Sequence, residues 1–121
     1  MSSFKDLLVY KKSFKLAMEI FEMTKTFPKE EVYSLTSQIR RSSKGIRDVI
    51  VEGYGRRRYK AEYIKYLTYS IASCDETINH IASIKTLYPD MKEFMEFEAE
   101  YEKLGKMINN YIQYVENNWN T

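Results

Sequence analysis

The chain has 121 residues, enough for one domain and too few for two, and only 4 Gly and 2 Pro, which favours long uninterrupted helices. The single cysteine excludes an intramolecular disulfide and a cysteine-based metal site within one chain. No apolar run approaches the ~20 residues of a membrane span, and the N-terminus lacks a signal-peptide pattern, so we expect a cytoplasmic protein without a membrane contact.

Charge is unevenly distributed along the chain, although its net value is only +2. Residues 40–60 carry eight basic and two acidic side chains, a net of +6. Residues 89–121 carry three basic and seven acidic side chains, a net of −4. This asymmetry predicts a molecule with one basic zone and one acidic zone.

Apolar residues spaced alternately three and four apart predict a first helix over about 5–26, which Pro28 ends. Its expected buried stripe is Leu7, Tyr10, Phe14, Ala17, Phe21 and Thr24. The same spacing predicts a second helix over about 30–53, with the acids of 30–31 in its first turn. We expect Gly53 and Gly55 to supply a left-handed turn that stops it.

Two further stripes predict helices over about 58–88 and 90–118, separated by Pro89. Four helices joined by short turns must alternate in direction, so we expect an all-α fold, a single antiparallel up-down four-helix bundle over 1–121. The repeat of about 3.5 residues predicts left-handed packing at a crossing angle of about 20°.

Apolar side chains outside these stripes cover more of the helices than a monomeric bundle needs. Tyr59, Tyr63, Tyr66 and Tyr69 follow one another at helical spacing at the start of the third helix. One interpretation is self-association through such residues. The other is that the tyrosines cover rim surface with their hydroxyls in water.

The basic zone is the candidate nucleic-acid-binding site, because Arg and Lys neutralise phosphates and release counterions. Its cations are Arg40, Arg41, Lys44, Arg47, Arg56, Arg57, Arg58 and Lys60. The candidates for base stacking or subunit contact are Tyr54, Tyr59, Tyr63 and Tyr66. Two alternatives stay open: a solvated face whose cations complete a helix C-terminus, or pairing with the acidic fourth helix of a neighbouring subunit.

No catalytic, metal or cofactor site is expected. His80 is the one histidine, which rules out a dyad with a second His and a His-rich metal site within one chain. Cys74 lies on the apolar stripe of the third predicted helix, so we expect it to be a small buried apolar residue. The segment 53–55 (GYG) follows no strand and precedes no Gly-Lys-Ser/Thr, so a tight interhelical turn explains it better than a phosphate loop.

Several motifs occur in an order that matches a known family. They are FKDL at 4–7, FP at 27–28 followed by Glu31, YSLTSQIRR at 33–41 and EGYGR at 52–56. Through them the chain resembles the four-helix-bundle family named for proteins encoded in 23S rRNA intervening sequences. One stretch departs from the family pattern: where the family usually reads SIPSNIAEG, residues 45–53 read GIRDVIVEG, with Arg47 for the proline and Val49 for the asparagine. Losing the proline restores a backbone donor and should straighten the helix.

The resemblance implies a ring-like homopentamer that binds nucleic acid, with no enzymatic activity established for the family. The family is similar in fold to the accessory variability determinants of diversity-generating retroelements, pentameric barrels that bind nucleic acid and a reverse transcriptase. We therefore predict a non-enzymatic, homo-oligomeric bundle that binds RNA or DNA, most simply RNA. The alternative is a protein-interaction scaffold, such as an accessory subunit that recruits a reverse transcriptase.

Overall fold

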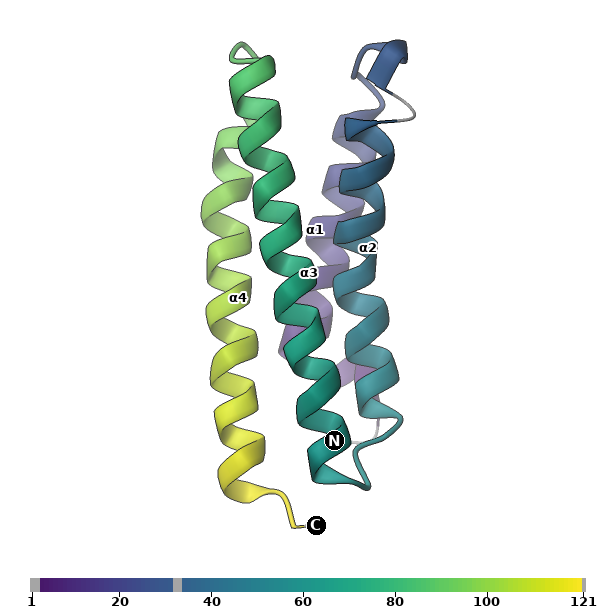
Figure 1. Cartoon of the computed structure of the whole chain (residues 1–121), viewed down its shortest axis with the longest axis vertical. Helices are drawn as coiled ribbons and strands as arrows, with labels where there is room; N and C mark the ends of the chain where they lie inside the picture. Colours follow the sequence, from purple (N-terminus) through teal and green to yellow (C-terminus); the bar gives the residue numbers. More distant parts are fainter. Residues whose placement is uncertain (1–2, 32–33, 121) are drawn as a thin grey trace.

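Four long helices make up the structure, a computed structural model that describes residues 3–31 and 34–120. They are α1 (Leu8–Thr24), α2 (Leu35–Tyr54), α3 (Lys60–Leu87) and α4 (Glu93–Asn118), with short 3-10 turns η1 (Phe4–Asp6) and η2 (Lys29–Glu31). The helices lie side by side along one long axis (Figure 1), and no strand occurs in the described ranges. The expected all-α class is confirmed.

The second helix begins later than its sequence predicted. Residues 29–31 form the separate turn η2, and α2 starts at Leu35, so the two acids do not occupy its first turn. Glu31 instead accepts hydrogen bonds from the Ser34 hydroxyl (2.7 Å) and the Tyr88 hydroxyl (2.8 Å). These contacts tie the α1–α2 connection to the end of α3, which explains why the acid is not used at a helix terminus. Val32, an apolar residue near the start of the predicted second helix, lies outside the described residues.

The buried face of α1 differs from the expected stripe. Its buried residues are Val9, Ser13, Leu16, Ala17, Ile20 and Thr24. Phe14 and Phe21 are 40% and 41% exposed, so their assignment to the core was wrong. The helix carries two neighbouring apolar stripes, and the one with smaller side chains allows the closer packing against the other helices.

The remaining core runs the length of the bundle and contains both aliphatic and aromatic side chains. Its fully buried members include Ile39, Ile46, Ile50, Tyr63, Leu67, Cys74, Ile81, Phe94, Tyr101, Leu104 and Ile108. Helix α2 packs against α1 and α3, and α3 packs against α4, whereas α1 and α4 share the smallest of these four seams. Helix α2 also continues without interruption through Arg47, where the family usually has proline.

Gly53 allows close packing of two helices and does not form the left-handed turn expected from the sequence. No described glycine has a positive φ, and Gly55 is right-handed at φ −63°. A Cβ built on Gly53 would lie only 2.8 Å from the Cβ of Tyr66 on α3. The absence of a side chain therefore lets α2 approach α3 just before the turn that joins them.

Replacing this glycine should destabilise the protein. We expect Gly53→Ala to lower the free energy of unfolding by about 1–3 kcal/mol, because the added methyl group forces α2 and α3 apart. Gly45→Ala in the same helix is the matched control, since its Cβ would meet its nearest neighbour, the Ser73 hydroxyl, at 3.7 Å. That change should raise the free energy of unfolding by about 0.5–1 kcal/mol. Urea unfolding followed by circular dichroism measures both, and equal stability of the two variants would contradict the packing role.

Candidate nucleic-acid interface

The structure divides the cations of the basic zone into two groups. Arg40, Arg41, Lys44 and Arg47 line an apolar groove of about 560 Å³ between α1 and α2, together with Ala17, Met18, Phe21 and Ser43. The other group, Arg56 to Arg58, occupies the turn between α2 and α3. Arg47, the groove cation nearest the turn, precedes the end of α2 at Tyr54 by seven residues, about 10 Å at 1.5 Å per helical residue. The two groups therefore occupy different parts of the surface.

Two of the groove cations are engaged in packing α2 against α1. Arg40 donates from Nε to the Thr24 hydroxyl at 2.7 Å, and its guanidinium lies 4.4 Å from the centre of the Phe21 ring. The side chain of Arg47 is only 15% exposed and lies 4.5 Å from the centre of the Phe14 ring. These two arginines cover the rings that α1 leaves outside the core. Contacts with α1 therefore account for the positions of both arginines without a ligand.

The other two groove cations are exposed. Lys44 forms an ion pair with Asp48 at 2.6 Å, one turn along α2, and Arg41 extends into solvent at the groove margin. Such exposed i, i+4 pairs contribute only about 0.3–0.5 kcal/mol. Both side chains therefore remain available to an anion at small energetic cost.

The turn arginines form a second pattern, in which each guanidinium lies over a tyrosine ring. Arg57 lies 3.9 Å from the centre of the Tyr54 ring, and Arg56 lies 4.4 Å from that of Tyr66. Arg58 lies 5.7 Å from the centre of the Tyr59 ring. All three arginines are exposed, so the turn presents three adjacent positive charges at one end of the bundle.

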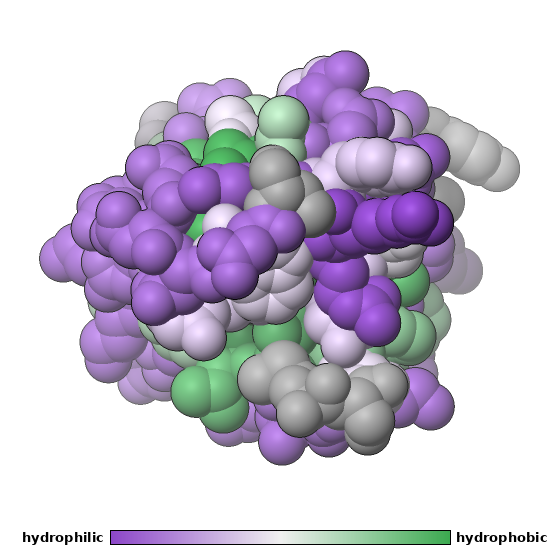
Figure 2. Space-filling model, turned by 90° about the horizontal axis from the view of Figure 1, so that it is seen from below, coloured by the Kyte–Doolittle hydropathy of each residue, from purple (hydrophilic) through white to green (hydrophobic). Residues whose placement is uncertain are grey.

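The C-terminal residues and η1 support this end of the bundle. Trp119 donates from its indole nitrogen to the Arg57 carbonyl at 2.7 Å, and the Lys60 ammonium donates to the Glu116 carbonyl. Phe4 of η1 contacts the Tyr54 ring edge-on at 6.5 Å between centroids. Viewed onto this end, the surface is mostly hydrophilic, with a smaller hydrophobic region to one side (Figure 2). Lys60 is thus held by the C-terminal end of α4, unlike the three arginines before it.

Burial removes two of the four tyrosines from the predicted stacking set. Tyr63 is fully buried, and its hydroxyl is hydrogen-bonded to that of Tyr111 at 2.8 Å. Burial and this bond raise the pKa of Tyr63 above its usual range. Tyr54 is buried beneath Arg57. Neither ring can stack on a base without unfolding, whereas Tyr59 is 59% exposed and Tyr66 is half-buried.

A family comparison covers most of the chain. The model for the 23S rRNA-intervening sequence protein matches residues 5–110. The chain belongs to this family. No curated protein matches it. The matched region includes both groups of cations and the α2–α3 turn.

Contacts within the fold hold the cysteine and the histidine. Cys74 is buried and donates from Sγ to the Tyr101 carbonyl at 3.2 Å. Burial raises the pKa of its thiol to about 12, so the nucleophilic thiolate is scarce at neutral pH. The side chain of His80 is only 13% exposed, and its Nε2 lies 3.5 Å from the Glu76 carboxylate, one turn earlier on α3. Across the described ranges, no group of three or more His, Cys, Asp or Glu side chains could hold a metal ion.

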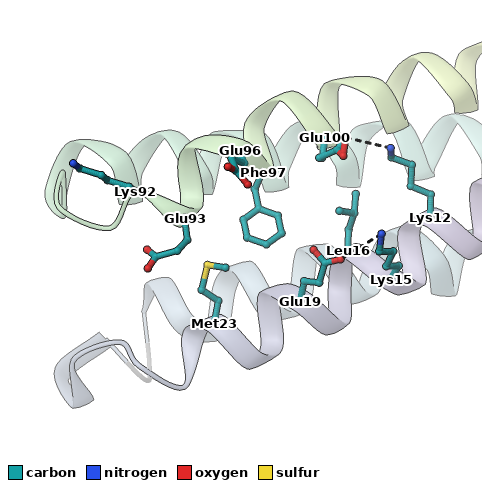
Figure 3. A pocket seen from close by; sticks show the side chains of 10 residues that line it. All are labelled: Lys12, Lys15, Leu16, Glu19, Met23, Lys92, Glu93, Glu96, Phe97 and Glu100. Atoms are coloured by element: carbon teal, nitrogen blue, oxygen red, sulfur yellow. Dashed lines mark hydrogen bonds and ion pairs between the residues drawn. The ribbon is translucent and has the colours of Figure 1, made fainter.

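A groove of about 510 Å³ between α1 and α4 is a feature that the sequence did not predict (Figure 3). The Lys12 ammonium lies 3.3 Å from the Glu100 carboxylate across the groove, and this contact lowers the pKa of Glu100. Lys15 lies 3.9 Å from Glu19 along α1. Because cations and carboxylates pair inside it, the groove has little net charge, unlike the α2–α3 turn.

None of the helices in the described part of the chain is long and apolar enough to cross a membrane.

Proposed function

We propose that this protein is a non-enzymatic, cytoplasmic nucleic-acid-binding subunit, most simply RNA-binding, whose contact surface is the α2–α3 turn. The observation that supports it is the row of three exposed arginines at 56–58 on one end of the bundle. Guanidinium groups neutralise phosphates and can bind them through two N–H donors at once. The family name, which refers to an intervening sequence of 23S rRNA, is consistent with an RNA partner.

The two cation groups contribute unequally in this proposal. The turn arginines are the primary phosphate contacts, because they are exposed and adjacent. Arg41 and Lys44 add contacts only for a nucleic acid long enough to run along α2. Arg40 and Arg47 contribute charge without direct contact, since their guanidiniums lie against α1. Phosphate contacts position a nucleic acid without reading its bases, so little sequence specificity is expected.

We also propose that the subunit is an antiparallel up-down bundle and that it assembles into a ring-like homopentamer. Phe14, Met18 and Phe21 form a partly exposed apolar stripe on α1, and the last two also line the groove that Arg41 and Lys44 border. Apolar side chains gathered on one helix face are typical of a contact with another protein surface. A ring would repeat the turn arginines around its axis and strengthen binding through avidity.

The alternative function uses the same arginines to recruit an acidic protein surface, such as that of a reverse transcriptase. This alternative differs from the leading proposal in two observable consequences. Association with that partner would survive nuclease treatment, and the purified protein would bind no nucleic acid at low salt.

Removing the turn arginines should weaken binding and reduce its salt dependence. For Arg56→Ala/Arg57→Ala/Arg58→Ala we expect the slope of log affinity against log salt to fall by about 2, since each contact with a single strand contributes about 0.7. Fluorescence anisotropy with labelled RNA across a salt series measures it. The matched control, Lys92→Ala/Lys103→Ala/Lys106→Ala, removes the same charge from α4 and should keep the wild-type slope. Equal loss in both variants would mean that only overall charge matters, and absence of binding by the wild type would favour the protein partner.

The oligomer proposal predicts that the α1 stripe is essential for assembly. We expect the wild type to sediment at about five times the 14.5 kDa of one chain. Met18→Lys should dissociate the oligomer, because a contact over the stripe would bury the new ammonium beside the four groove cations. Leu87→Lys is the control, since Leu87 is exposed at the C-terminal end of α3, on a different helix from the stripe. Analytical ultracentrifugation distinguishes the species. A wild type that stays at the mass of one chain at every concentration would contradict the proposal.

A further inference from the structure

The guanidiniums of Arg56 and Arg57 are fixed in place as flat surfaces. One face of Arg57 lies on Tyr54, which is itself held by an edge-on contact with the buried Tyr63, at 6.3 Å between centroids and 81° between planes. One face of Arg56 lies on Tyr66, which Tyr69 contacts edge-on at 5.4 Å. Tyr54 is thus held by a fully buried ring, and Tyr66 is held by its close approach to Gly53 as well as by its contact with Tyr69.

Hydrogen bonds to the backbone fix the orientation of both planes. Arg56 donates from Nη1 to the Glu52 carbonyl at 3.0 Å, and Arg57 donates from Nη1 to the Tyr54 carbonyl at 2.9 Å. A guanidinium has five N–H donors, so each group keeps several for a ligand. Because both residues are exposed although one face of each is covered, the opposite face is open to solvent.

An open guanidinium face that is held flat is suited to a nucleobase as well as to a phosphate. Bases stack on guanidinium planes and aromatic rings when they are unpaired and can be splayed out. In a duplex the faces of each base are already stacked on its neighbours, so such a surface gains little from it. Tyr59, with an exposed ring beside Arg58, adds a third flat group at the same turn.

We propose that the α2–α3 turn binds unpaired nucleotides in preference to duplex, with Arg56 and Arg57 as base-stacking platforms and their free N–H groups on phosphates. This inference rests on the proposed nucleic-acid binding at the same turn. It assigns these arginines a role that a lysine could not fulfil, because an ammonium has equal charge but no planar face.

The test replaces planar guanidinium groups by ammonium groups and keeps the charge the same. Arg56→Lys/Arg57→Lys is compared with the wild type and with Lys103→Arg/Lys106→Arg, a charge-preserving exchange on α4 outside the basic zone, as the matched control. The probes are a short labelled RNA without self-complementarity and the duplex of the same sequence, both by fluorescence anisotropy across salt. We expect the wild type to prefer the single strand by about tenfold or more, and the double variant to lose about tenfold on the single strand only. The salt slopes should stay unchanged, and Lys103→Arg/Lys106→Arg should behave as the wild type.

A second readout follows the stacked base directly. An RNA that carries 2-aminopurine should lose fluorescence on binding to the wild type, since stacking quenches this base, and should lose less with the double variant at saturation. Equal affinity of the wild type for single strand and duplex, or wild-type behaviour of the double variant in both readouts, would overturn the inference. That outcome leaves the proposed function standing if Arg56→Ala/Arg57→Ala/Arg58→Ala still weakens binding. If the alanine variant binds as the wild type does, the proposed function fails as well.

Discussion

At Gly53 the backbone of α2 comes so close to Tyr66 of α3 that no side chain would fit between them. This approach sets the distance between α2 and α3 just before the turn that joins them. It also brings Tyr66 under Arg56 and leaves Tyr54, the next residue after Gly53, under Arg57. The candidate interface is therefore a consequence of helix packing. In the EGYGR segment, Gly53 sets the distance between α2 and α3, Tyr54 lies beneath a guanidinium, and Arg56 lies at the surface.

The positive charge of residues 40–60 serves two physical purposes. Arg40 and Arg47 lie over aromatic rings of α1, and Arg40 also hydrogen-bonds to that helix, so their charge is coupled to packing. The turn arginines are exposed at the end of the bundle, where each lies over a tyrosine ring and Arg56 and Arg57 each donate to a backbone carbonyl. The distribution of charge along the sequence does not distinguish cations that pack against other helices from cations that are exposed to solvent. The distinction depends on the neighbours that each side chain has in the fold.

The helices could be predicted from the sequence because apolar periodicity over a long segment is a strong local signal. The buried face of α1 could not, since Phe14 and Ile20 belong to adjacent stripes that are both apolar, and only packing against α2 and α4 selects between them. The start of α2 depended on a tertiary contact, the bond from Tyr88 to Glu31, which no local pattern reveals.

For the candidate site, the sequence shows where the cations lie along the chain. It does not show which side chains each of them contacts. It also grouped Tyr63 with Tyr59, although the first is fully buried and the second is among the more exposed aromatic residues. Helical spacing places both near the start of α3, but burial depends on which of them faces α4. The pairing of arginines with tyrosines across the turn likewise depends on the three-dimensional approach of α2 and α3.

We propose that nucleic acid contacts this protein at the end of the bundle formed by the α2–α3 turn. In a photo-crosslinking experiment, a short RNA carrying a photoreactive uridine is irradiated in complex with the full chain, and the adducts are mapped by mass spectrometry. We expect adducts on the peptides that contain Tyr59 and Tyr66, beside the turn arginines. Adducts concentrated on α4, or spread evenly over the helices, would contradict it.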